Sequence, residues 1–94
     1  MGRTARGAGT PDPLVMALAG ELRRLRGECG MSLRELERVT FSSDSALSRY
    51  LSGQTVPPWP VVEALCREVG SGPETLRGLW TAARAARAES RAQR

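Results

Sequence analysis

The sequence predicts an all-α protein, and three observations support this prediction. Apolar residues recur every three or four positions in five stretches, which is the spacing of one face of a helix. Most of these stretches begin after serine, aspartate or proline and end before glycine, as helices do. Nowhere do apolar and polar residues alternate as they do in a half-buried strand. We therefore expect five helices and no sheet, near residues 13–28, 32–39, 43–52, 60–69 and 73–86.

The composition fits one small domain that is not an enzyme and holds no cofactor. The chain has 94 residues and no histidine, which excludes histidine-based catalysis and histidine–metal ligation. Cys29 and Cys66 lie far apart without CxxC spacing, so neither a disulfide framework nor a metal site is expected. The sequence has neither a glycine-rich phosphate loop nor a nucleophile elbow.

The longest apolar run is too short to cross a membrane. It extends from Leu14 to Ala19, whereas a membrane-spanning helix needs roughly 20 apolar residues. No arginine-led leader with a cleavage site precedes it. We therefore expect a cytoplasmic protein with no membrane association.

The positive charge of the chain lies at its ends. The net charge is +4, but residues 14–83 contain equal numbers of arginines and acidic residues. The excess comes from residues 1–12, which we expect to be a disordered basic tail, from Arg84, and from residues 87–94, which we expect to be a frayed tail of alanine and arginine. The first tail is either a basic arm that lies along DNA or a solvated terminus. The folded domain should span residues 13–86.

Residues 30–53 predict two short helices around a tight turn. Ser32 and Glu35 form a capping box, in which the serine oxygen accepts from a first-turn amide and the glutamate reaches back. Ser43 can cap the second helix, and Gly53 should end it. Two short helices joined by a tight turn make a helix-turn-helix.

The remaining helices should supply the rest of the core. Asp12-Pro13 should start the first helix as a cap and a first-turn proline, and the apolar stripe of that helix begins at Leu14. A stiff proline-rich connection precedes the fourth helix, because proline fixes its own backbone and restrains its neighbour. The expected core comprises Leu18, Leu22, Leu25, Leu36, Leu47, Leu51, Val62, Leu65 and Leu76, with Trp59 and Trp80 at least half buried.

An ungapped run of residues resembles a known family. The run comprises Gly30-Met31-Ser32, Glu35-Leu36, Ser43-x-Ser45-x-Leu47-Ser48-Arg49 and Gly53, followed by Pro57, Trp59, Val62-Glu63 and Gly70-x-x-Pro73-Glu74. With these residues the chain resembles the phage-repressor-like (Xre-type) DNA-binding domains, and its continuation as far as Trp80 is similar to the actinobacterial branch of that family. The resemblance covers roughly residues 14 to 83.

The resemblance implies a five-helix repressor-like bundle whose third helix reads the major groove of double-stranded DNA. The forked donors of Arg49 suit guanine O6 and N7, and helix amides at the starts of the second and third helices suit phosphate. The resemblance implies base contacts from Asp44, Ser45 and Arg49, and phosphate contacts from Ser32, Ser43, Ser52, Gln54 and Thr55.

Several residues depart from the family pattern and leave two functions open. Leu33 stands where a polar residue is usual, Glu37 where a small one is, and Thr40-Phe41 where the turn usually contains glycine. Asp44 places an acid at the front of the recognition helix. The first interpretation is a sequence-specific DNA-binding transcriptional regulator, acting as a dimer on two half-sites. The alternative is a protein–protein interaction module that keeps the fold, such as the N-terminal domain of a longer protein.

The last predicted helix has an apolar face that continues beyond residue 80. Leu79, Trp80, Ala83 and Ala86 lie at helical spacing along it. This face either pairs two copies or docks another protein, or it closes the core of the single chain.

Overall fold

The computed structural model describes residues 12–92 and confirms the predicted all-α fold. Within that range no strand occurs, and no helix is long and apolar enough to cross a membrane. The predicted basic tail lies outside the described residues, except for Asp12. The helices are α2 (Pro13–Cys29), α3 (Leu33–Thr40), α4 (Asp44–Ser52), α5 (Trp59–Glu68) and α6 (Glu74–Ala92).

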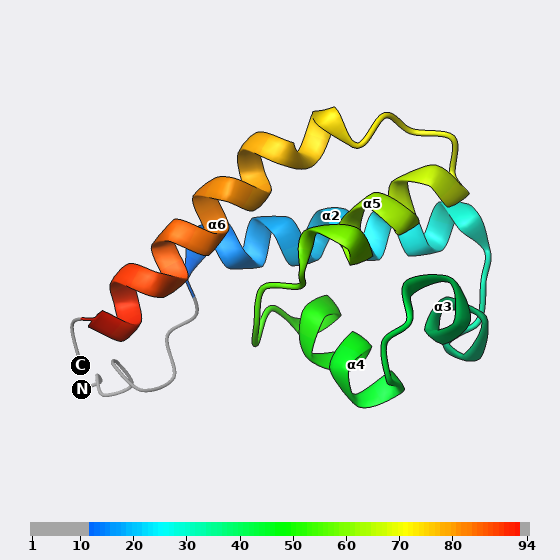
Figure 1. The fold of residues 1–94 in the computed structure, drawn as a ribbon, viewed down its shortest axis with the longest axis horizontal. Coiled ribbons are helices and arrows are strands. Elements are labelled where there is room, and N and C mark those ends of the chain that lie inside the picture. The colour runs from blue at the N-terminus through cyan, green and yellow to red at the C-terminus, as the bar shows by residue number, and fades with distance from the viewer. Residues whose placement is uncertain (1–11, 93–94) are drawn as a thin grey trace.

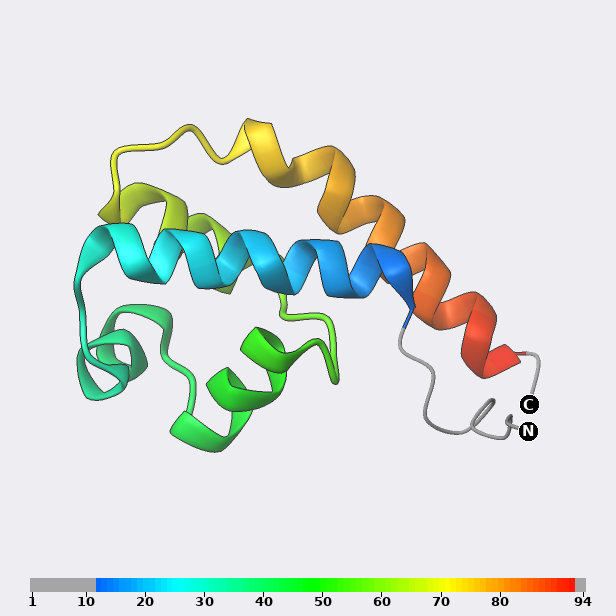
Figure 2. The same ribbon diagram turned by 180° about the vertical axis from the view of Figure 1, so that it is seen from behind.

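The long helix α2 forms the centre of the bundle. It packs against α6, α5 and α4, while α3 packs against α5 and α4. Figures 1 and 2 show α3 and α4 together on one side of α2, with the first half of α6 on the other side. The helix-turn-helix unit is thus supported from behind by α2 and α5, and its outer face is left open.

The core agrees with the predicted one at all but one leucine. Leu51 is only partly buried, because it lies in the last turn of α4, at the edge of the surface that α2 covers. Leu14 is 40% exposed, and Val15 faces the core in its place. The buried residues that the prediction named are Leu18, Leu22, Leu25, Leu36, Leu47, Val62, Leu65 and Leu76; Cys66 and Ala83 are buried as well, and the prediction omitted Val15, Ala19 and Val61.

Side-chain caps begin three of the helices, as the sequence predicted. Asp12 Oδ1 accepts from the Leu14 amide at 2.8 Å. Ser32 and Glu35 form the complete capping box, and Ser43 Oγ accepts from the Ala46 amide at 3.1 Å. The two serines are N-caps that precede the first helical residue, so α3 and α4 begin one residue later than expected.

The two tryptophans join the connection before α5 to the middle of α6. The Trp80 indole nitrogen donates to the Pro57 carbonyl at 2.8 Å, and the Trp59 and Trp80 ring centroids lie 5.3 Å apart. Trp80 is buried and Trp59 is partly buried, so both satisfy the prediction. Ala83 is also buried. The apolar face of α6 therefore closes the core of this chain as far as Ala83.

Helix α6 is longer than the sequence indicated. It continues to Ala92, six residues beyond the predicted end at 86, so that most of the expected frayed tail is helical. The physical reason is that alanine and arginine are strong helix formers and that neither glycine nor proline interrupts residues 79–92. The arginines that follow Ala83 therefore lie at fixed helical positions beyond the part of α6 that packs on the core.

The two cysteines are free thiols, and Cys66 belongs to the core. Burial raises the pKa of the Cys66 thiol, because the apolar surroundings disfavour the thiolate. The thiol therefore stays protonated at neutral pH and contributes as a small apolar group.

Candidate nucleic-acid interface

The first turn of α4 is exposed and held in place from its inner side. Leu47, one turn further along, is buried against the core and fixes the rotation of the helix. Ser43 uses its oxygen to cap the Ala46 amide, but its hydroxyl hydrogen remains able to donate. The other first-turn amides of a helix have no partner within the helix. The start of α4 therefore presents several donors to the outside on a rigid base.

The three residues predicted to contact bases are all exposed on α4. These are Asp44, Ser45 and Arg49. Within residues 12–92 neither Asp44 nor Arg49 takes part in an ion pair. Asp44 and Arg49 are five residues apart, which places them about 140° apart around the axis. The Asp44 carboxylate and the Arg49 guanidinium therefore point in different directions and do not neutralise each other.

At the start of α3 the capping box uses both the backbone amide and the side-chain oxygen of Ser32. The Ser32 amide donates to Glu35 Oε1 at 2.8 Å, and Ser32 Oγ accepts from the Glu35 amide at 3.2 Å. Of the polar groups of Ser32, only the hydroxyl hydrogen remains to donate to a phosphate. The Glu35 carboxylate lies at the same helix end and adds negative charge there, so the predicted phosphate contact of Ser32 has an acidic neighbour.

The segment after α4 brings Ser52 and Gln54 to the surface but turns the Thr55 hydroxyl inward. Ser52 Oγ donates to the Arg49 carbonyl at 3.2 Å, and the Gln54 side chain is exposed. Thr55 Oγ1 is buried, with no hydrogen-bond partner among the described residues. A phosphate contact by Thr55 therefore requires the side chain to rotate about χ1, which the sequence pattern did not indicate.

Gly53 determines where this segment begins. Its φ of 82° is in the left-handed region, where glycine is favoured. A Cβ at this position would lie 2.4 Å from Met16 Sδ of α2. The glycine thus allows α4 to end directly against α2. A further link between the two helices is the hydrogen bond that Arg23 of α2 donates to the Leu51 carbonyl.

Phe41 is an unusual residue in this unit that sequence reasoning noted only as a departure from the family pattern. It has a φ of 55° in the turn between α3 and α4, and its side chain is 94% exposed. A bulky residue in the left-handed region is strained, since only glycine adopts it without cost. The aromatic ring thus occupies the outer surface of the turn without burying apolar area.

Comparison with known proteins identifies one family. Residues 17–80 match a family model described as a helix-turn-helix domain. This match includes α3, α4 and the connection between them, together with most of α2, all of α5 and the start of α6. Comparison with curated proteins and with solved structures gives no match.

Proposed function

The chain belongs to the helix-turn-helix domain family, and on that premise we propose that it is a sequence-specific DNA-binding transcriptional regulator. The observation that carries the proposal is the exposed first turn of α4, fixed by Leu47 and capped by Ser43. In helix-turn-helix proteins the second helix of the unit enters the major groove with its first residues toward the bases.

In this arrangement Asp44 and Ser45 face the base edges and Arg49 lies further along the helix. An aspartate accepts from cytosine N4, and a serine donates or accepts at several bases. Arg49 reaches either a guanine edge or a phosphate. Because its guanidinium is in no ion pair within residues 12–92, no protein partner among them has to be displaced.

Phosphate contacts fall to the residues on either side of α4. The hydroxyl groups of Ser32 and Ser43 and the exposed amide of Gln54 are the donors that we propose, and Ser52 joins them when its hydroxyl turns away from the Arg49 carbonyl. Since residues 14–83 are neutral overall, these neutral donors and the helix amides carry most of the backbone contact of the domain. We therefore expect modest affinity for DNA in general and a preference that comes from base contacts.

The subfamily of the chain, its location in the cell and its assembly are proposals as well. We place the chain among the phage-repressor-like (Xre-type) members, in the actinobacterial branch, acting in the cytoplasm. Two copies on a two-half-site operator remain the proposed assembly. Pairing through the apolar face of α6 receives less support, because Trp80 and Ala83 are buried within one chain. Sedimentation of the protein at high micromolar concentration that shows only monomer would remove that pairing.

Selection of bound sites from random duplex DNA tests the function directly. We expect enrichment of one sequence, with an affinity that falls as salt rises because the arginines that meet phosphates release bound counterions. Ser45→Ala should change the enriched sequence without changing the melting temperature. Recovery of random sequences alone, with no salt dependence of binding, would contradict the proposal and favour the protein–protein interaction module.

A further inference from the structure

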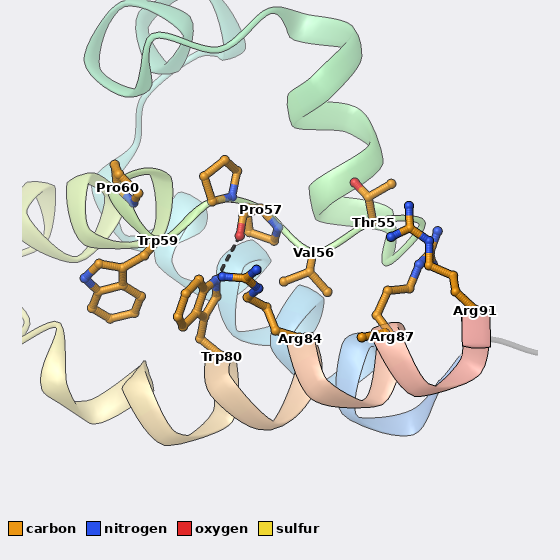
Figure 3. A pocket seen from close by; sticks show the side chains of 11 residues that line it. Thr55, Val56, Pro57, Trp59, Pro60, Trp80, Arg84, Arg87 and Arg91 are labelled. Carbon is orange, nitrogen blue, oxygen red and sulfur yellow. Dashed lines mark hydrogen bonds between the residues drawn. The ribbon is translucent and has the colours of Figure 1, made fainter. Parts of the chain in front are cut away.

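A groove lies between the proline-rich connection and the second half of α6. Its volume is about 600 Å³, which is within the usual range of ligand sites. Figure 3 shows the connection on one side and the arginine side chains of α6 on the other. Its lining is Thr55, Val56, Pro57, Pro58, Trp59, Pro60, Trp80, Arg84, Arg87, Ala88 and Arg91.

The groove is preformed, because its two sides are tied together at one end. The Trp80 indole donates to the Pro57 carbonyl across the groove. Arg77 lies over the Trp59 ring at 4.5 Å, and Arg84 lies over the Trp80 ring at 5.2 Å. Prolines restrict the backbone of the opposite side. An occupant therefore meets a rigid surface and loses little affinity to ordering of the protein.

The wall formed by α6 carries an uncompensated positive charge. No acidic residue lines the groove, and Arg84, Arg87 and Arg91 form no ion pair in the part of the chain that the structure describes. Like charges three or four residues apart on a helix repel one another. An anionic occupant would relieve that repulsion, and the groove has no anionic group of its own.

Apart from the arginines, the lining of the groove is mostly apolar. Val56 and Pro57 of the connection, Trp59 and the α6 residue Trp80 contribute hydrocarbon and aromatic groups rather than free hydrogen-bond donors. Pro57 and Trp80 are buried, so the accessible apolar surface comes from Val56 and Trp59, which are partly exposed. The site therefore suits an occupant that carries both carboxylates and apolar side chains.

We propose that this groove binds an acidic peptide segment of another protein, one whose carboxylates alternate with bulky apolar side chains. Along α6 the three arginines span about 10 Å, since the helix rises 1.5 Å per residue. An extended peptide rises about 3.3 Å per residue, so carboxylates two residues apart lie about 6.6 Å from each other on one side of the peptide, close to the rise of about 6 Å from Arg87 to Arg91. The apolar side chains of the peptide then pack on Val56 and Trp59.

Other occupants fit less well. The ends of the chain, with Arg3, Arg6 and Arg94, are themselves basic, and a second copy carries the same net charge of +4. The sugar–phosphate chain of DNA satisfies arginines but has no apolar side chains for the tryptophan side of the groove. The proposal goes beyond DNA binding and does not depend on it.

The test is a selection from random peptides displayed on phage, with the parent protein as target. We expect enriched peptides rich in aspartate and glutamate next to bulky apolar residues. The best of them, synthesised with a fluorescent label, should bind about tenfold more weakly to the double variant R87E/R91E, because two attractive charge pairs become repulsive. Val56→Ser should also weaken binding, because it removes apolar contact area.

The matched control is the double variant R34E/R38E. These two arginines are exposed and, like Arg87 and Arg91, four residues apart on one helix, but they lie on α3, away from the groove. We expect the control to bind the selected peptide within about twofold of the parent, and both double variants to keep the melting temperature of the parent, as exposed substitutions usually do.

Three outcomes would overturn the proposal. The first is a selection that enriches no peptide. The second is enriched peptides that bind the parent and R87E/R91E equally, which would place their site elsewhere. The third is a loss of duplex DNA binding in R87E/R91E for every sequence tested, without any change in peptide binding, which would make the arginine wall part of the DNA interface.

Discussion

The start of α4 and the second half of α6 differ in how their surfaces arise. The start of α4 has small polar residues and one acid, and its position is fixed by the packing of Leu47 behind it. The second half of α6 has three arginines with few core contacts, and it owes its order to helix propensity. The excess positive charge of the chain therefore lies away from the predicted recognition helix α4. The position of α4 is set by the packing of Leu47 and not by charge.

The largest expected effect comes from removing the packing behind α4. Leu47→Ala should lower the free energy of unfolding by about 2–5 kcal/mol, because a fully buried leucine leaves a cavity. Ser45→Ala, two residues away on the exposed side, should leave stability nearly unchanged. Thermal melts of both variants check this. Equal stability of Leu47→Ala and the parent would mean that α4 is rotated from the orientation described above.

The end of α4 is expected to be nearly as sensitive as its core face. Gly53→Ala forces alanine into a left-handed conformation and brings its Cβ against Met16, at a cost of about 2–3 kcal/mol of stability. Gly70→Ala is the matched control, since Gly70 also has a positive φ but no atom lies within 4 Å of the added Cβ. It should cost about 1 kcal/mol. Denaturant unfolding that gives the same loss for both glycines would contradict the close approach of α4 and α2.

Arg49→Ala tests how the exposed side of α4 meets DNA. If Arg49 reads guanine, the variant should bind its selected site about 1–3 kcal/mol more weakly and lose preference at one base pair. If Arg49 holds a phosphate, the loss should be similar for all sequences, and the dependence on salt should fall by about one unit. Binding titrations on the selected and a scrambled duplex distinguish the two. Unchanged affinity of Arg49→Ala for both duplexes would exclude a contact between Arg49 and DNA.

Phe41→Gly should raise stability, in contrast to the other substitutions of this unit. The variant relieves the left-handed strain and removes no buried contact, so we expect a gain of about 1 kcal/mol. Phe41→Ala keeps a side chain in the strained backbone conformation and should remain close to the parent. The difference between the two variants in thermal melts measures the relief of strain less the entropy that glycine adds to the unfolded chain. A loss of stability in both variants would show that the exposed ring contributes to the fold.

Local signals in the sequence predicted most of the helix-turn-helix unit. The capping box of Ser32 and Glu35 and the buried Leu47 follow from spacing alone, because helix periodicity and capping are short-range properties. Leu51 was wrongly placed in the core, because the spacing gives its face but not the edge of the α2 surface that covers it.

Features that depend on contacts between distant parts of the chain could not be predicted from these short-range signals. The inward turn of the Thr55 hydroxyl and the groove beside it arise where residues 55–60 meet α6. The close approach at Gly53 involves Met16, far back in the sequence. The conformation of Phe41 was missed because the propensity of a bulky residue argues against it. The last six residues of α6, 87–92, show the reverse, since propensity extends the helix where no core requires it.

The most direct test of the central claim, that the first turn of α4 lies against DNA, is a binding titration of Asp44→Asn. The parent and the variant are compared on the selected and on a scrambled duplex at two salt concentrations. We predict that Asp44→Asn binds the scrambled duplex more tightly than the parent does, because an acid that repels nearby phosphates has been removed, and that the difference shrinks at the higher salt. Unchanged affinity, with only a slight loss of stability from the lost helix-dipole interaction, would contradict the claim.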